Sequence, residues 1–344
     1  MSSKNTTIGI DLGDRRHAVC VLSAAGAIVA ETDLANTREC LTAFAQRYPG
    51  ATFVMETGTH SPWVSRLLES LGHHVIVANA RKLRAISTSH TKNDQEDARM
   101  LARLGRADPA LLSPVKHRSE SAQRALLQLK VREALVRSRV NQINSTRFLL
   151  KSLGVLVPAG RKAMTFTRKL RAQVDLATAA LVEPLLTMID ALNVRIKELD
   201  HQLEAMADEQ YPVTARLRQV PGVGPLTATA LIGSVPHIHA FTRGRQFASW
   251  LGLTPRESSS GRRRTLGGIS KRGDRYLRSL LAHGARSVLR AAVVRARSPQ
   301  RLTRLHQWGL RLRERRGQNR AVIAVANKLA RIIWAVWSRD LAFT

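Results

Sequence analysis

Apolar and polar positions in the N-terminal part of the chain follow a pattern typical of strands alternating with helices. Three short apolar segments between turn residues lie within residues 6–34, and single apolar segments follow further along. Helix start and stop signals lie between them, including Asn93 as a predicted N-cap. The order predicts a mixed α/β domain over residues 1–115. The expected elements are strands within 6–34 and at 51–56 and 73–79, and helices at 36–48, 61–72 and 93–106.

The middle of the chain has a helical heptad pattern instead. Its apolar residues recur at alternating spacings of four and three, at Leu185, Ile189, Leu192, Ile196, Leu199, Leu203 and Met206. This spacing predicts a coiled-coil seam, so we interpret residues 116–210 as a helical coiled-coil arm. The stretch 126–150 can supply the partner within the chain, giving a helical hairpin. The seam can equally face a second copy, giving a dimerisation arm, and the sequence leaves both hypotheses open.

Residues 211–344 predict a mainly helical C-terminal domain. Two amphipathic helices, at about 273–297 and 319–338, carry arginines between apolar residues. The Pro-Gly-Val-Gly turn at 221–224 is typical of a helix–hairpin–helix element whose amides hold phosphate, or of a plain turn between helices. The predicted fold class is therefore α/β followed by all-α.

Charge points to a polyanionic partner. The 344 residues carry a net charge of +30, which self-repels unless a polyanion such as nucleic acid balances it. Residues 1–120 hold 15 basic and 12 acidic residues, whereas residues 251–320 hold 19 basic and 3 acidic ones. We find no run of about 18 apolar residues that would span a membrane, and no signal-peptide pattern. Cys20 and Cys40 are too few for a disulfide framework or a metal quartet. We therefore expect an intracellular protein without a membrane partner.

Four acids of the α/β part lie where a nuclease needs them. Asp11 ends the first predicted strand and Glu56 ends the fourth, while Asp94 and Asp97 are three apart and share one helix face. Clustered carboxylates repel one another unless divalent cations bind them, and two Mg²⁺ ions roughly 3.5–4 Å apart support phosphoryl transfer. The pattern is typical of an RNase H-like nuclease. Any one of these acids alone would more often be solvated surface.

The stretch "TPRESSSGRRRTLGG" places three serines beside three arginines. A serine hydroxyl is a poor nucleophile unless a base or metal takes its proton and cations stabilise the charge developing on phosphorus. Guanidinium groups match phosphate oxygens, so this stretch predicts either a nucleophile or a basic loop that only holds a nucleic-acid backbone. The predicted phosphate-binding residues are Arg262, Arg263, Arg264, Lys271, Arg272 and Arg275.

Other arginines and tryptophans of the C-terminal part are secondary candidates. The arginines lie on helical stretches with few acids and would hold phosphate rather than read bases. Trp308 can stack on a nucleotide, whereas Trp334 and Trp337 lie on an apolar helix and are expected in the core. These arginines are Arg286, Arg290, Arg297, Arg301 and Arg304.

These motifs together resemble a known family. "GIDLG", "VMETG", "KNDQEDA" and, later, "VPGVGPLTATALI" and "FASWLGLTPRESSSG" occur in the order seen in insertion-sequence transposases with a RuvC-like Asp-Glu-Asp-Asp domain and a C-terminal serine transposase domain. Their relatives are the pilin-gene invertases, and members are known as bridge-RNA-guided recombinases. The resemblance covers nearly the whole chain.

The resemblance carries implications for site, partners and location. It places the metal-binding tetrad on Asp11, Glu56, Asp94 and Asp97, with Mg²⁺ as cofactor, and Asp14 and Glu96 as bystanders. It places a catalytic serine on Ser260, with Ser259 as second choice, which would form a covalent phosphoserine link to DNA. It also implies a site composed from two protomers of a dimer or tetramer, a noncoding guide RNA, and a cytoplasmic, nucleoid-associated prokaryotic protein.

Two alternatives remain beside this recombinase. A RuvC-like endonuclease would hydrolyse DNA with a metal-activated water and no serine. A non-catalytic scaffold would bind DNA or RNA without cutting either. The first predicts that Ser260→Ala still cleaves, and the second that replacing Asp11 changes nothing in strand breakage.

Overall fold

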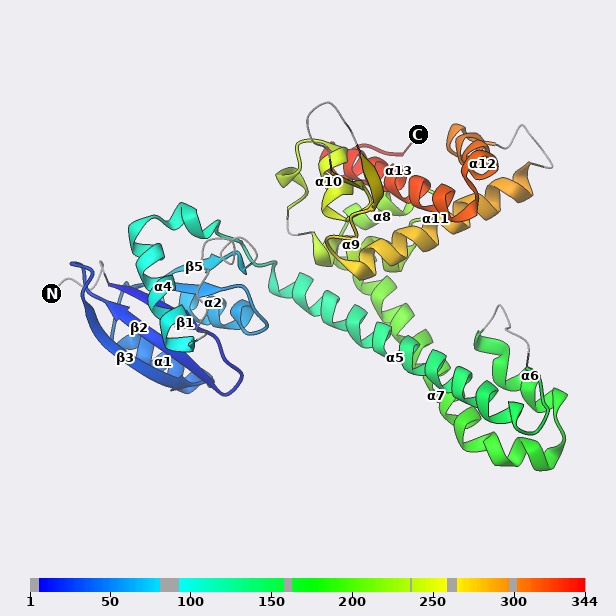
Figure 1. Ribbon diagram of the computed structural model, residues 1–344, viewed down its shortest axis with the longest axis horizontal. Helices are drawn as coiled ribbons and strands as arrows, with labels where there is room; N and C mark the ends of the chain where they lie inside the picture. The colour runs from blue at the N-terminus through cyan, green and yellow to red at the C-terminus, as the bar shows by residue number, and fades with distance from the viewer. Residues whose placement is uncertain are drawn as a thin grey trace. The chain divides into compact units, whose positions relative to one another are not determined.

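The computed structural model describes residues 6–80, 93–157, 163–235, 237–258, 265–296 and 302–343. Contacts divide the chain into two compact units, Met1–His117 and Arg118–Thr344. The first is built on a sheet and the second is largely helical (Figure 1). The predicted succession of an α/β part and a helical part is confirmed, while the three-domain boundaries at 115 and 210 stay predictions.

The first unit contains one five-stranded sheet in the order β3-β2-β1-β4-β5. The first three strands are antiparallel neighbours, whereas β4 runs parallel to β1 and β5 runs parallel to β4. All five predicted strands are therefore present. They are β1 (Thr7–Asp11), β2 (Arg16–Leu22), β3 (Ile28–Ala35), β4 (Thr52–Glu56) and β5 (His74–Ala78).

Helices cover both faces of this sheet. Helices α1 (Arg38–Gln46) and α2 (Ser61–Ser70) pack on one face, where Leu41 and Leu68 join a core with Ile8 and Val19. Helix α4 (Asp94–Ala107) packs on the other face through Ala98 and Ala102, against Ala18, Cys20 and Leu22. A 3-10 turn, η2 (Pro109–Leu112), follows α4. The three helices confirm those predicted from the sequence.

The contact between α4 and β1 is made by backbone. A Cβ built on Gly9 would lie 2.0 Å from the carbonyl oxygen of Ala98 and 2.6 Å from the amide nitrogen of Ala102. Only a residue without a side chain allows the helix to lie this close to the strand. Gly105 of α4 allows a similarly close approach to strand β4, because a Cβ built on Gly105 would lie 2.4 Å from Cγ2 of Val54.

The arm of the second unit is a hairpin within the chain. Helices α5 (Glu120–Lys151) and α7 (Leu176–Gln210) pack side by side, with η3 (Ala163–Thr165) and α6 (Phe166–Gln173) near the turn between them (Figure 1). Of the predicted seam, Ile189, Ile196 and Leu203 are buried and the other four members are half-buried. Arg139 Nη1 of α5 donates to Asn193 Oδ1 of α7 at 2.9 Å. The intramolecular hairpin is thus confirmed.

The rest of the second unit is a helical core that carries one small β-hairpin. Its centre is formed by residues such as Leu277, Leu281, Val325 and Leu329. The predicted helices 273–297 and 319–338 correspond to α11 and α13. The elements are α8 (Val213–Arg218), α9 (Pro225–Ser234), η4 (Ile238–Ala240), α10 (Gly244–Trp250), β6 (Pro255–Glu257), β7 (Leu266–Ile269), α11 (Arg275–Arg295), α12 (Arg304–Arg316) and α13 (Gln318–Ser338).

Two features of this core answer questions left open by the sequence. The Pro-Gly-Val-Gly turn packs on α11, since a Cβ on Gly222 would lie 2.6 Å from the carbonyl oxygen of Gly284. This favours a packing turn over a phosphate-binding one. Trp334 donates from Nε1 to the carbonyl oxygen of Phe241 at 2.9 Å, and Trp337 packs against the same core, as predicted.

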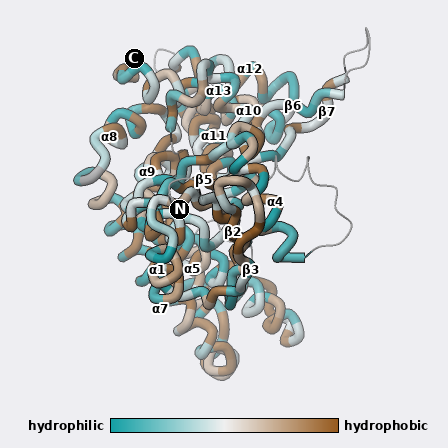
Figure 2. The backbone as a smooth tube through the Cα atoms, turned by 90° about the vertical axis from the view of Figure 1, so that its left-hand side faces the viewer, coloured by the Kyte–Doolittle hydropathy of each residue, from teal (hydrophilic) through white to brown (hydrophobic). Residues whose placement is uncertain are grey.

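Hydropathy differs strongly between elements. In Figure 2 strand β2 is brown, whereas β6 and α12 are largely teal. Two helices, Leu176–Glu209 and Gln318–Ser338, are long and apolar enough to cross a membrane by length and composition alone. Neither helix is an uninterrupted apolar run, because Glu183 and Asp190 lie in the first and Lys328 and Arg331 in the second. Both helices also pack inside the second unit, α7 against α5 and α13 against α11, which makes them weak evidence for a membrane.

We predict that Gly9→Ala destabilises the first unit, because the new methyl group would force α4 away from β1. Overpacking of this kind costs roughly 1–3 kcal/mol. Thermal unfolding measures the loss of stability, and hydrogen exchange of the β1 amides shows whether the contact with α4 is weakened. Gly58→Ala is the matched control, since a Cβ there meets nothing within 4 Å. Equal stability of Gly9→Ala and the parent protein would show that α4 and β1 are not in backbone contact.

Candidate active site

Asp11 and Glu56 lie at the ends of adjacent parallel strands. The register pairs Ile10 of β1 with Met55 of β4, and the next residues along the two strands are Asp11 and Glu56. Alternation along a strand places Asp11 on the same face as Gly9, and Glu56 on the same face as Val54. Both Gly9 and Val54 contact α4. The two half-buried acids therefore lie side by side on the face that α4 covers.

The first turn of α4 brings the other two acids to this face. The side chain of Asn93 accepts a hydrogen bond from the Gln95 amide at 3.1 Å, which confirms the predicted N-cap and fixes where the helix begins. The Gln95 side chain donates from Nε2 to the carbonyl oxygen of Val19 at 3.0 Å. This bond ties the turn that contains Asp94 and Asp97 to the sheet.

The side chains of the four acids are less closely gathered than their backbones. Asp94 lines a surface cavity of about 540 Å³ together with Arg16 and Asp33, and none of the other three acids lines it. Among the described residues, no three His, Cys, Asp or Glu side chains are grouped so that they could hold a metal ion. The donor chemistry suits Mg²⁺, which prefers carboxylate oxygens. The backbone positions of the four acids are compatible with a metal site, but their side chains do not form one in the rotamers of this structure.

Neighbouring acids are already engaged elsewhere. Arg99 of α4 pairs with both Glu31 and Glu96, and its hydrogen bond to Glu31 lowers the pKa of that carboxyl to about 2. Glu56, Asp94 and Asp97 form no ion pair within the described ranges. Glu96 is thus paired with Arg99, whereas Glu56, Asp94 and Asp97 stay available for a cation, and the bystander role of Glu96 stays a prediction.

A polar cluster that sequence analysis missed holds the loop after Asp11. His60 Nε2 donates to Asp14 Oδ1 at 3.0 Å, and His60 Nδ1 accepts from Trp63 Nε1 at 3.3 Å. Asn36 Nδ2 donates to the carbonyl oxygens of Gly13 and Asp14 at 3.2 and 3.1 Å. The predicted bystander Asp14 thus anchors this loop. Spacing in the sequence gives no signal for it, because the partners come from three separate segments.

Ser258, the first residue of the serine stretch, directly follows strand β6 of the β-hairpin in the second unit. Strands β6 and β7 pair Pro255 with Ile269, and the amide of Ser258 donates to the carbonyl oxygen of Thr265 at 3.0 Å. The structure does not describe residues 259–264. Ser259, Ser260, Arg262, Arg263 and Arg264 lie outside the described residues, so their predicted roles stay predictions.

The base of this hairpin is held by close backbone contacts. A Cβ on Gly252 would lie 2.0 Å from the carbonyl oxygen of Arg272, and one on Gly273 would lie 2.0 Å from that of Trp250. Arg278 Nη1 donates to the carbonyl oxygen of Leu251 at 3.1 Å. Close contacts therefore hold the β6/β7 hairpin in place where it joins the rest of the second unit.

The described basic candidates lie on the surface near this base. Lys271, Arg272 and Arg275 are all exposed, the last at the start of α11. Arg286 and Arg290 of α11 and Arg304 of α12 are exposed too, while Arg297 and Arg301 lie outside the described ranges. Exposed arginines suit contact with a phosphate backbone.

Sequence comparisons agree with this two-part arrangement. Residues 8–154 match the DEDD domain of IS110-type transposases, and residues 214–300 match the domain described as "Transposase IS116/IS110/IS902 family". The chain is similar to a "Probable family 20 transposase" of Pseudomonas aeruginosa, with 33% identity over 87% of this chain and 88% of the relative.

Two further relatives match almost end to end. The "Transposase for insertion sequence element IS1111A" of Coxiella burnetii is 32% identical over 97% of this chain and 90% of its own length. The "Transposase for insertion sequence element IS1328" of Yersinia enterocolitica is 30% identical over 98% of both chains. The four acids fall inside the matched DEDD domain and the serine hairpin inside the second matched domain. The chain belongs to the IS116/IS110/IS902 family of transposases, enzymes that cut and rejoin DNA.

Proposed function

We propose that this transposase cuts and rejoins DNA through a covalent phosphoserine intermediate on Ser260, supported by a Mg²⁺-binding site of Asp11, Glu56, Asp94 and Asp97. The observation that carries the proposal is the strand register that sets Asp11 beside Glu56 under the first turn of α4. The sheet order β3-β2-β1-β4-β5, with β1 to β3 antiparallel, supports an RNase H-like fold for this unit.

In the reaction proposed for the serine, the number of phosphate ester bonds stays constant. The Ser260 oxygen attacks a DNA phosphorus, loses its proton and releases a sugar hydroxyl, so one ester bond forms as another breaks. A hydroxyl from a second DNA end then attacks the phosphoserine and frees the serine again. Mg²⁺, when bound, would supply positive charge for the phosphate oxygens. Arg262, Arg263 and Arg264 would hold the same oxygens bidentately.

We extend the proposal to partners. The net charge of +30 supports binding of more than one nucleic-acid segment, here DNA ends and a noncoding guide RNA. Exposed apolar side chains on the arm, Phe148 at 73% and Leu181 at 72% exposure among them, support self-association as a dimer or tetramer. In such an assembly the serine of one protomer would meet the carboxylates of another.

A covalent-trapping assay tests the serine. Purified protein, element-junction DNA, the RNA flanking the gene and Mg²⁺ are mixed, denatured in detergent and separated on a gel. We expect a protease-sensitive DNA–protein band that disappears in Ser260→Ala and Asp11→Asn, because one removes the nucleophile and the other a carboxylate of the metal site. Ser258→Ala and Glu96→Gln are matched controls that should keep the band, since Ser258 flanks the loop and Glu96 is held by Arg99.

Each other result of this assay has a definite meaning. Loss of the band only in Ser259→Ala would move the nucleophile by one residue. Cleaved DNA without an adduct, undiminished in Ser260→Ala, would refute serine chemistry and leave a hydrolytic RuvC-like nuclease. Membership in a DNA-cutting family already argues against the non-catalytic scaffold.

Mg²⁺ binding can be tested without DNA. We expect Mg²⁺ to raise the unfolding temperature of the first unit, because an ion that binds only the folded state stabilises it by about 2.7 kcal/mol at 100 times its Kd. Asp97→Asn should abolish this response, because it removes one carboxylate of the assigned site. Glu96→Gln should keep the full response. An equal Mg²⁺ response in both variants would contradict the assigned site.

A further inference from the structure

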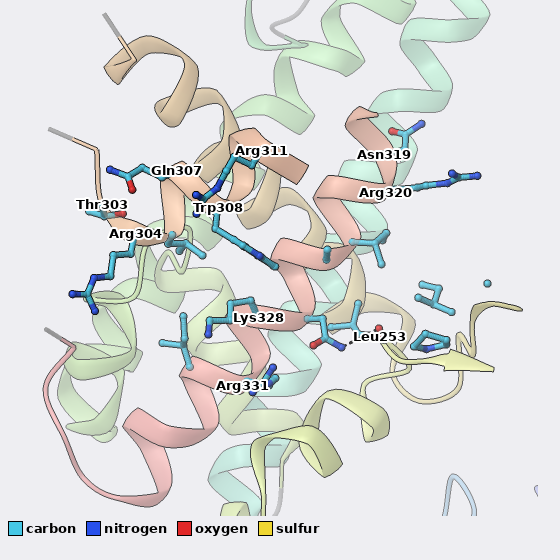
Figure 3. Close-up of a pocket in the computed structure, with 18 of the residues that line it drawn as sticks. Leu253, Thr303, Arg304, Gln307, Trp308, Arg311, Asn319, Arg320, Lys328 and Arg331 are labelled. Atoms are coloured by element: carbon cyan, nitrogen blue, oxygen red, sulfur yellow. Dashed lines mark hydrogen bonds between the residues drawn. The ribbon is translucent and has the colours of Figure 1, made fainter. Parts of the chain in front are cut away.

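A large cavity in the second unit is not explained by the proposed chemistry. It lies between α12, α13 and the β6/β7 hairpin, with a volume of about 1490 Å³ (Figure 3). Pockets for small molecules measure roughly 300–1,000 Å³. The cavity is therefore too large for one metabolite and large enough for a segment of a polymer.

The floor of the cavity is apolar, and two aromatic residues line the cavity, Trp308 and Phe343. Trp308 extends from α12 toward α13 (Figure 3), and Ile323 and Ile332 of α13 belong to the same lining. Trp308 is half-buried and packs against the core of the unit. Its indole Nε1 donates no hydrogen bond to any residue that the structure describes. One part of the ring is thus supported by the core while another borders open space.

The rim of the cavity is cationic. Five basic side chains line it, and no Asp or Glu is found among the described residues of the lining. None of the five forms an ion pair with another described residue. All five are exposed, so their charge is available to a partner. They are Arg304, Arg311, Arg320, Lys328 and Arg331.

We propose that this cavity binds an unpaired stretch of a DNA strand. Its bases would enter the apolar floor and one would stack on Trp308, while the rim would hold the phosphates. A DNA duplex presents only phosphates and groove edges, so it cannot use the apolar floor. An apolar peptide would leave five cations without a partner. The combination of floor and rim therefore fits a single strand best.

The position of the cavity connects it with the reaction. Pro255, Gly267 and Gly268 of the hairpin form one wall, and Asn327 Nδ2 of α13 donates to the carbonyl oxygen of Leu253 at 3.1 Å. The strands of this hairpin lead into residues 259–264. This step rests on the proposed function: the strand held here would be the one that Ser260 attacks. Holding it unpaired would offset the few kcal/mol that unstacking requires.

Binding of labelled oligothymidine of about twelve nucleotides, followed by fluorescence anisotropy on the full chain, tests the stacking. We expect Trp308→Ala to weaken binding roughly tenfold and Trp308→Phe to keep most of it, because phenylalanine still offers a ring face. Trp337→Ala is the matched control. It removes another half-buried tryptophan from the same core but does not line the cavity, and it should leave the affinity unchanged.

The salt dependence of the same binding tests the rim. The double variant Lys328→Ala/Arg331→Ala should reduce the slope of log K against log salt by about 0.7 for each phosphate that the protein no longer neutralises. Arg168→Ala removes an exposed arginine of α6 that does not line the cavity, and it should leave the slope unchanged. An unchanged slope in the double variant would overturn the proposal.

Other occupants of the cavity would show themselves in these assays. A Trp308-dependent preference for oligouridine over oligothymidine would assign the cavity to RNA. Loss of self-association in Trp308→Ala, with DNA affinity intact, would assign it to a second copy of the chain. Either result overturns the proposal. Failure of the serine hypothesis is seen separately, because the trapping gel reports only the covalent adduct and the anisotropy of oligothymidine reports only reversible binding.

Discussion

The close packing of α4 on β1 is the constraint on which the candidate site depends. With glycine at position 9, the backbone of α4 lies directly on the strand, at Ala98 and Ala102. Because the helix cannot shift away, its first turn lies over the end of β1, where Asp11 is. The parallel pairing of β1 and β4 then adds Glu56. The position of the helix that carries Asp94 and Asp97, relative to the strand that carries Asp11, therefore depends on one residue without a side chain.

The same device fixes the serine hairpin in the second unit. Gly252 and Gly273 allow residues 250–252 and 272–273 to cross with their backbones in contact. Both glycines have a positive φ, of 73° and 88°, which other residues adopt only with strain. The nucleophile proposed for this stretch would have to meet a phosphate with precise geometry, which a rigid base of the hairpin favours. In both units glycine is placed where precision of the backbone matters.

Much of this arrangement could be predicted from the sequence, and the rest depends on long-range contacts. The strand pattern, the Asn93 cap and the order of the four acids are local features, and each is written in a few adjacent residues. The heptad seam predicted the helix α7 but not its partner, because Ile189 and Ile196 would pack equally well on a second chain. The cluster around His60, and the cavity that the β6/β7 hairpin forms with α12 and α13, join residues far apart in sequence, and no spacing rule reveals them.

The distribution of charge assigns different tasks to the two parts. Residues 1–120 have nearly balanced charge, so their long-range electrostatic attraction for DNA is weak. Residues 251–320 carry 19 basic and 3 acidic residues and can supply that affinity. Attraction for DNA is thus concentrated in the part of the chain that also contains the serine stretch and the cationic cavity, whereas the four predicted metal-binding acids lie in the part with nearly balanced charge. A strand bound in the cavity would therefore be held by the same unit that carries the proposed nucleophile.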